Sequence, residues 1–246
     1  MNNNQKQHKE IIIIPAYNEA PSLAGVIKNI RTHYPAADIL VVNDGSQDNT
    51  GSIAEREADI AINLPFNSGY GIALQTGFKY AYRHKYEYII SMDADGQHDP
   101  GCIPQLLKEL ESGEHDLILG SRFLQSTTFK MPFLKRIGLL FFRSAVLFHT
   151  GQKITDPTTG YQALNRRILK FYTTHFYPSD FPDADLLIMI HFAGFTFKEV
   201  PVVMHPNPKV KGMHHGLLIP IYYAFKMVLS ILTALLRKKE AYEQSE

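Results

Sequence analysis

Several features that usually help to assign a function are missing from this sequence. Its 246 residues include a single cysteine, Cys102, which excludes an internal disulfide framework and a cysteine-based zinc site. The 25 Lys and Arg residues nearly balance 24 Asp and Glu residues, and a net charge of +1 gives no reason to expect nucleic-acid binding. The first ten residues are polar and lack the apolar core of a secretory signal, so we expect a cytoplasmic protein.

Apolar runs alternate with helical patterns through the first half of the chain. The runs rich in Ile, Val and Leu predict strands at 11–14, 39–42, 60–64, 88–92 and 117–119. The intervening segments have apolar residues at helical spacing or follow helix-start signals, at 21–33, from about 47, from the opening at 67–71 to about 83, and at 100–111. This order predicts an α/β fold with a mostly parallel central sheet covered by helices on both faces.

The strand at 88–92 is followed directly by two carboxylates, Asp93 and Asp95, and then by Gln97. Hard oxygen ligands suit Mg²⁺ or Mn²⁺, which proteins often hold with one or two carboxylates and the phosphates of a substrate. By itself, an Asp-x-Asp pair also occurs in ordinary solvated turns.

Polar clusters also follow two other predicted strands, at Asn18-Glu19 and at Asp44-Gly45-Ser46. In open α/β sheets, ligands bind beyond the carboxyl ends of the strands, so these clusters and the two aspartates predict a nucleotide crevice. The chain has no P-loop, and Gly69-Tyr70-Gly71 does not extend into G-x-G-x-x-G, which disfavours a Walker or Rossmann site.

The second half carries a Leu- and Phe-rich helical pattern at 132–150, in which Lys135, Leu139 and Arg143 share one face. A turn-rich loop at 155–161 follows, and then a predicted helix at 183–192. The pattern at 197–204 predicts a strand, with Pro201 at an edge or a bulge.

The segment Leu217–Leu236 is almost entirely apolar and is followed by Arg237-Lys238-Lys239. With Pro220 near its start it is marginal for a full span, so we expect a helix lying in the membrane interface. Docking on the domain core or on a small membrane-protein partner is the alternative. The expected organisation is a disordered polar N-terminus at 1–9, a catalytic domain at 10–213, and a membrane-associating helix with a polar tail at 214–246.

Six motifs occur in an order and spacing that resemble a known family. They are Pro15-Ala16-Tyr17-Asn18-Glu19, Asp44-Gly45-Ser46-x-Asp48, Asn67-x-Gly69-x-Gly71-x-Ala73-Leu74-x-x-Gly77, Asp93-Ala94-Asp95-Gly96-Gln97, Gly120-Ser121-Arg122 and Asp156-Pro157-Thr158-Thr159-Gly160. The chain resembles family 2 glycosyltransferases of the GT-A fold, in the dolichyl/polyprenyl-phosphate sugar synthase branch. The resemblance covers about residues 10 to 205. It implies an inverting sugar transfer from a nucleotide diphosphate sugar, with UDP favoured over GDP.

The resemblance also implies roles for individual residues. Pro15, Tyr17, Glu19 and Ser46 belong to the donor site, and Asp44 accepts a hydrogen bond from the base. Asp93, Asp95 and Gln97 surround a Mg²⁺ or Mn²⁺ ion and the diphosphate. Arg122, with Arg136 or Arg143, binds the acceptor phosphate, and Asp156 is the carboxylate near the acceptor.

The sequence departs from the family pattern at three places. Tyr70 stands where many relatives have Lys, and Gln162 stands where relatives often have Arg. The loop after Met204 lacks the common Arg-x-x-Gly-x-Ser form, so Lys209 and Lys211 are candidates for its cationic role.

The chemistry of the acceptor separates the hypotheses. A hydroxyl acceptor needs a base, for which Asp156 is the first candidate and Asp183 or Asp185 are alternatives. A lipid phosphate is already anionic and needs cations beside the donor diphosphate, which the arginines supply. We therefore expect a metal-dependent transferase acting on polyprenyl phosphate at the inner face of the membrane. Transfer to a sugar hydroxyl in polysaccharide synthesis and a non-catalytic nucleotide-sugar-binding subunit remain alternatives, and homo-oligomer formation stays open.

Overall fold

The computed structural model of the chain describes residues 9–124, 133–180, 182–206 and 233, with side chains from Arg136 onward in the second range. The strands are β1 (Glu10–Ala16), β2 (Asp38–Asn43), β3 (Ile60–Asn63), β4 (Tyr88–Ser91), β5 (Leu117–Ser121), β6 (Gln162–Asn165) and β7 (Phe197–Pro201). The helices are α1 (Ala20–His33), α2 (Thr50–Glu57), α3 (Tyr70–Arg83), α4 (Ile103–Glu111), α5 (Phe133–Thr150), α6 (Arg166–Tyr172) and α7 (Ala184–Phe192), with a 3₁₀ turn, η1 (Pro100–Cys102), before α4.

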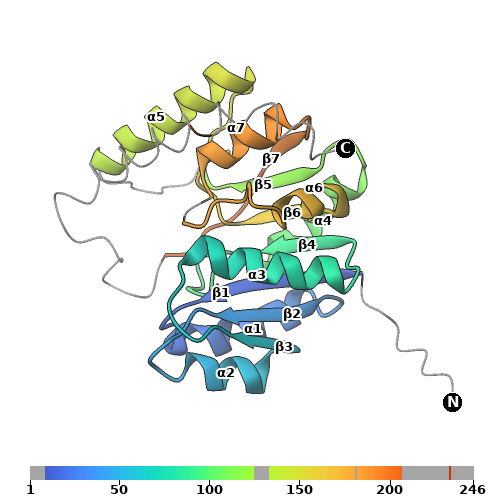
Figure 1. The fold of residues 1–246 in the computed structure, drawn as a ribbon, viewed down its shortest axis with the longest axis vertical. Coiled ribbons are helices and arrows are strands. Elements are labelled where there is room, and N and C mark those ends of the chain that lie inside the picture. The colour runs from blue at the N-terminus through green and yellow to red at the C-terminus, as the bar shows by residue number, and fades with distance from the viewer. Residues whose placement is uncertain (1–8, 125–132, 181, 207–232, 234–246) are drawn as a thin grey trace, which may run out of the picture.

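The seven strands form one sheet in the order β3-β2-β1-β4-β6-β5-β7 (Figure 1). Neighbouring strands are parallel except that β6 runs antiparallel to both β4 and β5. The carboxyl ends of β1, β2 and β4 therefore meet at one edge, where the polar clusters of the sequence follow. The mostly parallel sheet predicted from the sequence is confirmed.

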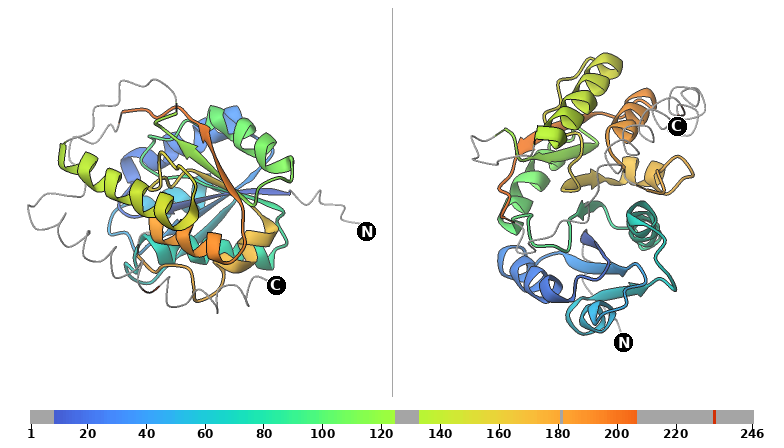
Figure 2. Two further views of the ribbon diagram at one scale, coloured as in Figure 1. Left: turned by 90° about the horizontal axis from the view of Figure 1, so that it is seen from above. Right: turned by 90° about the vertical axis from the view of Figure 1, so that its left-hand side faces the viewer.

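Helices cover both faces of this sheet (Figure 2). Alternate residues of β1 enter opposite cores because successive strand side chains point to opposite faces. Ile11 and Ile13 pack in the core formed with α3, α6 and α7, whereas Ile12 and Ile14 pack in the core formed with α1 and α4. All four side chains are fully buried, as expected for a strand covered on both sides.

The sequence missed two elements and overextended a third. The strand β6 and the helix α6 were not predicted, although Asn165 caps α6 by accepting a hydrogen bond from the Ile168 N–H at 3.1 Å. The strand β7 ends at Pro201 instead of extending to Met204. It lies at an edge of the sheet, as the proline predicts.

Most of the two predicted terminal segments, 1–9 and 214–246, lies outside the described residues, and only Thr233 of the apolar C-terminal segment is described. Lys209 and Lys211, at the end of the predicted catalytic domain, also lie outside them. Within the described ranges, no helix is both long enough and apolar enough to cross a bilayer.

Candidate functional site

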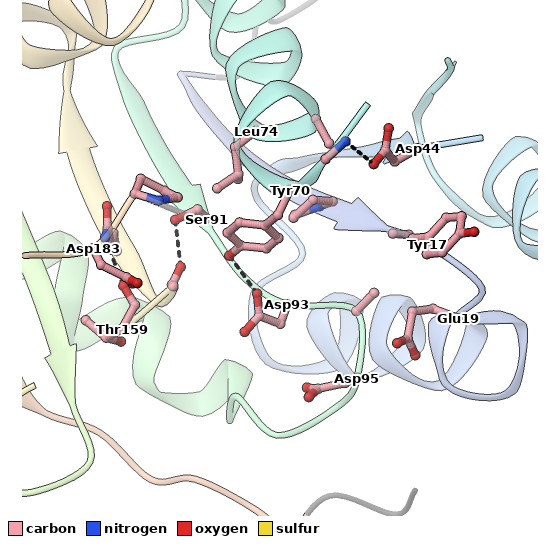
Figure 3. A pocket seen from close by; sticks show the side chains of 18 of the residues that line it. Tyr17, Glu19, Asp44, Tyr70, Leu74, Ser91, Asp93, Asp95, Thr159 and Asp183 are labelled. Atoms are coloured by element: carbon pink, nitrogen blue, oxygen red, sulfur yellow. Dashed lines mark hydrogen bonds between the residues drawn. The ribbon is translucent and has the colours of Figure 1, made fainter. Parts of the chain in front are cut away.

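A cavity of about 450 Å³ opens at the carboxyl edge of the sheet. One side comes from the ends of the first strands, with Pro15, Tyr17, Glu19 and Asp44, and the other side comes from the 158–160 loop and Asp183. Asp93 and Asp95 lie on the segment that follows β4, and the Tyr70 ring stands near the centre of the cavity (Figure 3). This volume falls in the range of ligand pockets of folded enzymes.

Three residues predicted for the donor site follow β1. Pro15 is buried next to the last residue of the strand, and the Tyr17 side chain is 37% exposed, which leaves an aromatic surface open to a ligand. The Glu19 carboxylate also lines the cavity and accepts a hydrogen bond from the Ser22 hydroxyl at 2.7 Å. Tyr17 and Glu19 lie at one end of the cavity, on the β1 side (Figure 3), and Pro15 lines it as well.

Asp44 and Ser46 act on the backbone around the cavity. The Asp44 carboxylate is 3% exposed and accepts hydrogen bonds from the Ser68 and Gly69 N–H groups at 2.7 and 2.9 Å. It thereby fixes the loop that begins α3. The Ser46 hydroxyl accepts from the Asn18 N–H at 2.9 Å and does not line the cavity. The expected contact between Asp44 and a base stays a prediction.

The Asp93 carboxylate is held from two sides. The Tyr70 hydroxyl donates to Asp93 Oδ1 at 2.8 Å, and His98 Nε2 lies 3.6 Å from Oδ2. His98 Nδ1 also accepts the Asp93 N–H at 3.1 Å, and its ring stacks on Tyr161. Burial and the neighbouring Asp93 raise the pKa of Tyr70, so its phenol stays protonated and donates. Tyr70 therefore orients the carboxylate without adding positive charge to the cavity.

Asp95 pairs with Gln97, whose N–H donates to Asp95 Oδ1 at 3.0 Å and whose side-chain amide donates to Oδ2. Asp93 and Asp95 both line the cavity, whereas Gln97 does not and meets it through Asp95. Two carboxylates that face one cavity fit a hard divalent cation, because a diphosphate and water can supply its remaining oxygen ligands. Gln97 is therefore better placed to orient Asp95 than to act as a metal ligand itself, which was its expected role.

Gly160 brings the second half of the chain against this pair. A Cβ at position 160 would lie 2.6 Å from the Tyr70 hydroxyl oxygen and 3.1 Å from Asp93 Oδ1. The Gly160 carbonyl also accepts a hydrogen bond from the Ser91 hydroxyl at 2.8 Å. The absence of a side chain thus lets the 158–160 loop close over the end of β4.

Arg122 and Asp156 form a bidentate ion pair beside the cavity. Arg122 Nε lies 2.7 Å from Asp156 Oδ2 and Nη2 lies 3.0 Å from Oδ1, and Asp156 is fully buried. Glu199 of β7 supports this pair by accepting the N–H groups of Thr155 and Asp156 at 2.7 and 2.6 Å. Both Asp156 oxygens are therefore already occupied, which disfavours the prediction that this carboxylate acts as a base.

The two other arginines predicted to bind the acceptor phosphate, Arg136 and Arg143, lie in different surroundings. Arg143 turns toward the same loop, where Nε donates to the Thr155 carbonyl at 2.7 Å and the guanidinium lies 4.9 Å from the Phe123 ring centre. Arg136 is exposed in the first turn of α5, away from this network. The structure brings Arg143, but not Arg136, to Arg122 through the 155–156 loop.

Asp183, which the sequence offered only as an alternative, lines the cavity just before α7. Burial, with the nearby carboxylates of Asp185 and Asp156, raises the pKa of Asp183 to about 7, while Arg122 opposes the shift. In Figure 3 its side chain lies beside Thr159, on the side opposite Tyr17. The acidic Asp183-Ala-Asp185 start of the helix was the available signal, but helix-dipole stabilisation explains that pattern equally well.

The comparisons with known proteins agree with this geometry. The sequence model of Glycosyl transferase family 2 matches residues 11–173. The chain belongs to this family. An uncharacterized protein of Methanocaldococcus jannaschii is 32% identical over 193 residues, which cover 78% of this chain and 79% of that protein.

Two further relatives carry functional names. The polyprenol monophosphomannose synthase of Mycolicibacterium smegmatis is 32% identical over 66% of this chain and 63% of its own length. The UDP-N-acetylglucosamine--dolichyl-phosphate N-acetylglucosaminyltransferase of Methanococcus voltae is 32% identical over 65% of this chain and 70% of its own length. The family 2 glycosyltransferase thus has distant homologues that transfer sugars to polyprenyl or dolichyl phosphate.

Among solved structures, glucosyl-3-phosphoglycerate synthase from Mycobacterium tuberculosis, in complex with Mn²⁺, UDP-glucose and phosphoglyceric acid, superposes with a TM-score of 0.69. The match covers 94% of this chain and 80% of that one at 16% identity, a level that supports the fold alone. The GT-A fold expected from the sequence is confirmed.

Proposed function

We propose that the protein is a metal-dependent inverting transferase that moves a sugar from a nucleotide diphosphate sugar, UDP-linked, to polyprenyl phosphate at the inner face of a membrane. The observation that carries the proposal is the division of the cavity. Two carboxylates, Asp93 and Asp95, lie on the donor side, and the Arg122 and Arg143 guanidiniums lie behind the opposite loop.

On the donor side, Pro15, Tyr17 and Glu19 receive the nucleoside, and Asp44 shapes the loop beside it. A bound Mg²⁺ or Mn²⁺ would be held by Asp93 and Asp95, with Gln97 orienting Asp95, and would stabilise the charge that develops on the leaving diphosphate. Tyr70 fixes Asp93 Oδ1 and His98 lies 3.6 Å from Oδ2, so the carboxylate is held in one orientation for that role.

On the acceptor side, an oxygen of the lipid phosphate forms a bond to the anomeric carbon while the bond from that carbon to the diphosphate oxygen breaks. Attack from the opposite face inverts the configuration. The acceptor phosphate carries no proton that must be removed, so this reaction needs no base. Arg122 holds the acceptor phosphate beside the donor diphosphate, which is also negatively charged. Asp156 acts as the positioning partner of Arg122. Guanidiniums suit this task because they stay charged and carry five N–H donors, of which the pair with Asp156 uses two on Arg122.

Asp183 favours a second candidate, transfer to a sugar hydroxyl. A carboxyl with a pKa of about 7 at the acceptor end is suited to take a proton during attack. In that reaction Asp183 removes the hydroxyl proton and nucleoside diphosphate leaves. A non-catalytic binding subunit is disfavoured because it would not need Asp93 and Asp95 to face one cavity.

A product assay tests the proposal. The protein is incubated with Mg²⁺ or Mn²⁺, radiolabelled UDP- and GDP-sugars and a short-chain polyprenyl phosphate, with the Asp95→Ala variant as the control. Label entering an acid-labile lipid fraction supports the lipid phosphate acceptor, and acid-stable product supports the hydroxyl acceptor. No turnover of any donor would contradict both reactions.

The Asp183→Asn variant separates the two reactions, with exposed Asp180→Asn as its matched control. Transfer to lipid phosphate should survive the change at Asp183, because the acceptor is already ionised. Transfer to a hydroxyl should fall by about a hundredfold or more, the usual contribution of a general base.

A further inference from the structure

The outer face of α5 exposes an unusual amount of apolar surface. Ile137, Leu140, Phe141, Leu147 and Phe148 are all exposed, Phe148 by 84%, and they make up half of the ten large apolar side chains exposed in the described part of the chain. Their spacing places them along one side of the helix. We call these five residues the α5 face. In Figures 1 and 2 the helix lies at the periphery of the molecule, and an apolar patch of this kind marks an interaction site.

The opposite side of α5 is fixed by the fold. Leu139 and Val146 are buried, and Val146 belongs to the core shared with α7. Arg143 reaches the Thr155 carbonyl, next to the Arg122–Asp156 pair. The helix is therefore held in one orientation, with its apolar face outward and its cationic side chain toward the site.

The sequence around α5 has a one-sided charge. Between Asp116 and Asp156 there is no acidic residue, whereas six cations occur: Arg122, Lys130, Lys135, Arg136, Arg143 and Lys153. The rest of the chain holds 19 Lys and Arg against 24 Asp and Glu. Arg136 and Lys153 are exposed at the two ends of the α5 face. Apolar side chains flanked by cations and free of acids are typical of helices that lie on anionic lipid.

We propose that the α5 face is the surface by which the protein lies on an anionic membrane, with its five apolar side chains in the boundary between headgroups and acyl chains. The inference deepens the proposed function and rests on it for the acceptor, since a lipid whose phosphate is at Arg122 has its chain beside α5. Two copies of the face would bring cations against cations with no acid to pair, which disfavours a symmetric contact. The apolar C-terminal segment, 217–236, also contains no acidic residue and is followed by Arg237-Lys238-Lys239, so that the first acid after it is Glu240.

The chain has no tryptophan, so a single introduced indole reports on the face directly. In the full-length Phe148→Trp variant, emission should be water-like in the free protein and should shift to the blue with vesicles of phosphatidylcholine and phosphatidylglycerol. Vesicles of phosphatidylcholine alone should give a weaker shift. The matched control is Phe66→Trp, which replaces a ring that is 67% exposed in the loop before α3 and should not respond. Blue emission before lipid is added would show that a second copy or the C-terminal segment covers the face, and would overturn the proposal.

A charge-insertion variant supplies the second measurement. Leu140→Glu/Phe148→Glu should lower vesicle partitioning at least about tenfold, since two apolar contacts are replaced by anions. The control Ile72→Glu changes an exposed residue of α3 and should partition like the unmodified protein. Equal partitioning of all three proteins would refute the α5 face as the docking surface.

Turnover separates this inference from the proposed function. The double variant should keep its activity on a short-chain acceptor in solution and lose it on acceptor embedded in vesicles. Vesicle binding through α5 without any turnover would contradict the proposed function and leave the docking surface standing. Turnover that requires the lipid acceptor, together with vesicle binding that the α5 substitutions do not change, would support the proposed function and refute the docking surface.

Discussion

The buried pair of Arg122 and Asp156 leads to a prediction with a defined magnitude. The Asp156→Ala variant removes the bidentate partner of the Arg122 guanidinium, whose side chain is 19% exposed. Removing one partner of a buried ion pair costs about 3–5 kcal/mol, because the other charge stays desolvated. In a chain of this size each kcal/mol lowers the melting temperature by about 2–4 °C, so we expect a fall of about 6–20 °C.

Differential scanning calorimetry at neutral pH measures this fall. The matched control is Glu109→Ala, which breaks the 2.6 Å pair with Lys198, where both side chains reach solvent, and should leave the melting temperature unchanged. The Arg122→Ala/Asp156→Ala double variant should recover part of the loss, since neither charge is then buried alone. A melting temperature for Asp156→Ala within about 2 °C of the unmodified protein would refute the assignment of Asp156 as the counter-ion of Arg122.

The other predictions concern the cavity. Asp95→Ala should lower turnover at least about a hundredfold without loss of helical circular dichroism, and near-normal activity would remove Asp95 from the site. Tyr70→Phe should weaken Mn²⁺-dependent UDP binding about tenfold in titration calorimetry, because Asp93 loses a hydrogen bond, whereas metal-free nucleotide binding should change little. Gly160→Ala should weaken the same binding, since the new Cβ would meet the Tyr70 hydroxyl, and unchanged affinity would show that the loop moves freely. The raised pKa of Asp183 means that its contribution to stability is complete below about pH 4 and is lost as the pH rises to about 7, so Asp183→Asn should flatten the melting temperature over this window.

The sequence predicted the strands of the first half well because each is a short run rich in Ile, Val or Leu, and because polar clusters follow three of them, β1, β2 and β4. The strand β6 escaped prediction because Gln162-Ala163-Leu164-Asn165 is short and shows no clear alternation. Its position comes instead from pairing with β4 and β5 on both sides. Such pairing depends on residues 40 to 80 positions away and leaves no local pattern.

The same limit applies to the site. Asp93 and Asp95 were predictable because they follow one strand, whereas the Tyr70 contact with Asp93 joins two motifs 23 residues apart. The sequence predicted cations near the acceptor but gave no indication that both carboxylate oxygens of Asp156 are paired with Arg122. Only the folded chain shows which of Asp156 and Asp183 keeps a carboxylate that faces the cavity.

The antiparallel direction of β6 affects which part of the chain can be exchanged between relatives as one unit. The strand β5 ends at Ser121 and β6 begins at Gln162, and the two meet through the Gly120 N–H and the Tyr161 carbonyl at 2.8 Å. The chain between them therefore leaves and re-enters the sheet at almost the same point, so the two ends of the segment lie next to each other. Residues 122–161 carry α5, Arg122 and Arg143, while Tyr17, Asp44 and the Asp93–Asp95 pair lie outside them. If the proposed function holds, exchange of this one segment between relatives changes the acceptor side in a single step, provided that the 158–160 loop still fits against Tyr70 and Asp93.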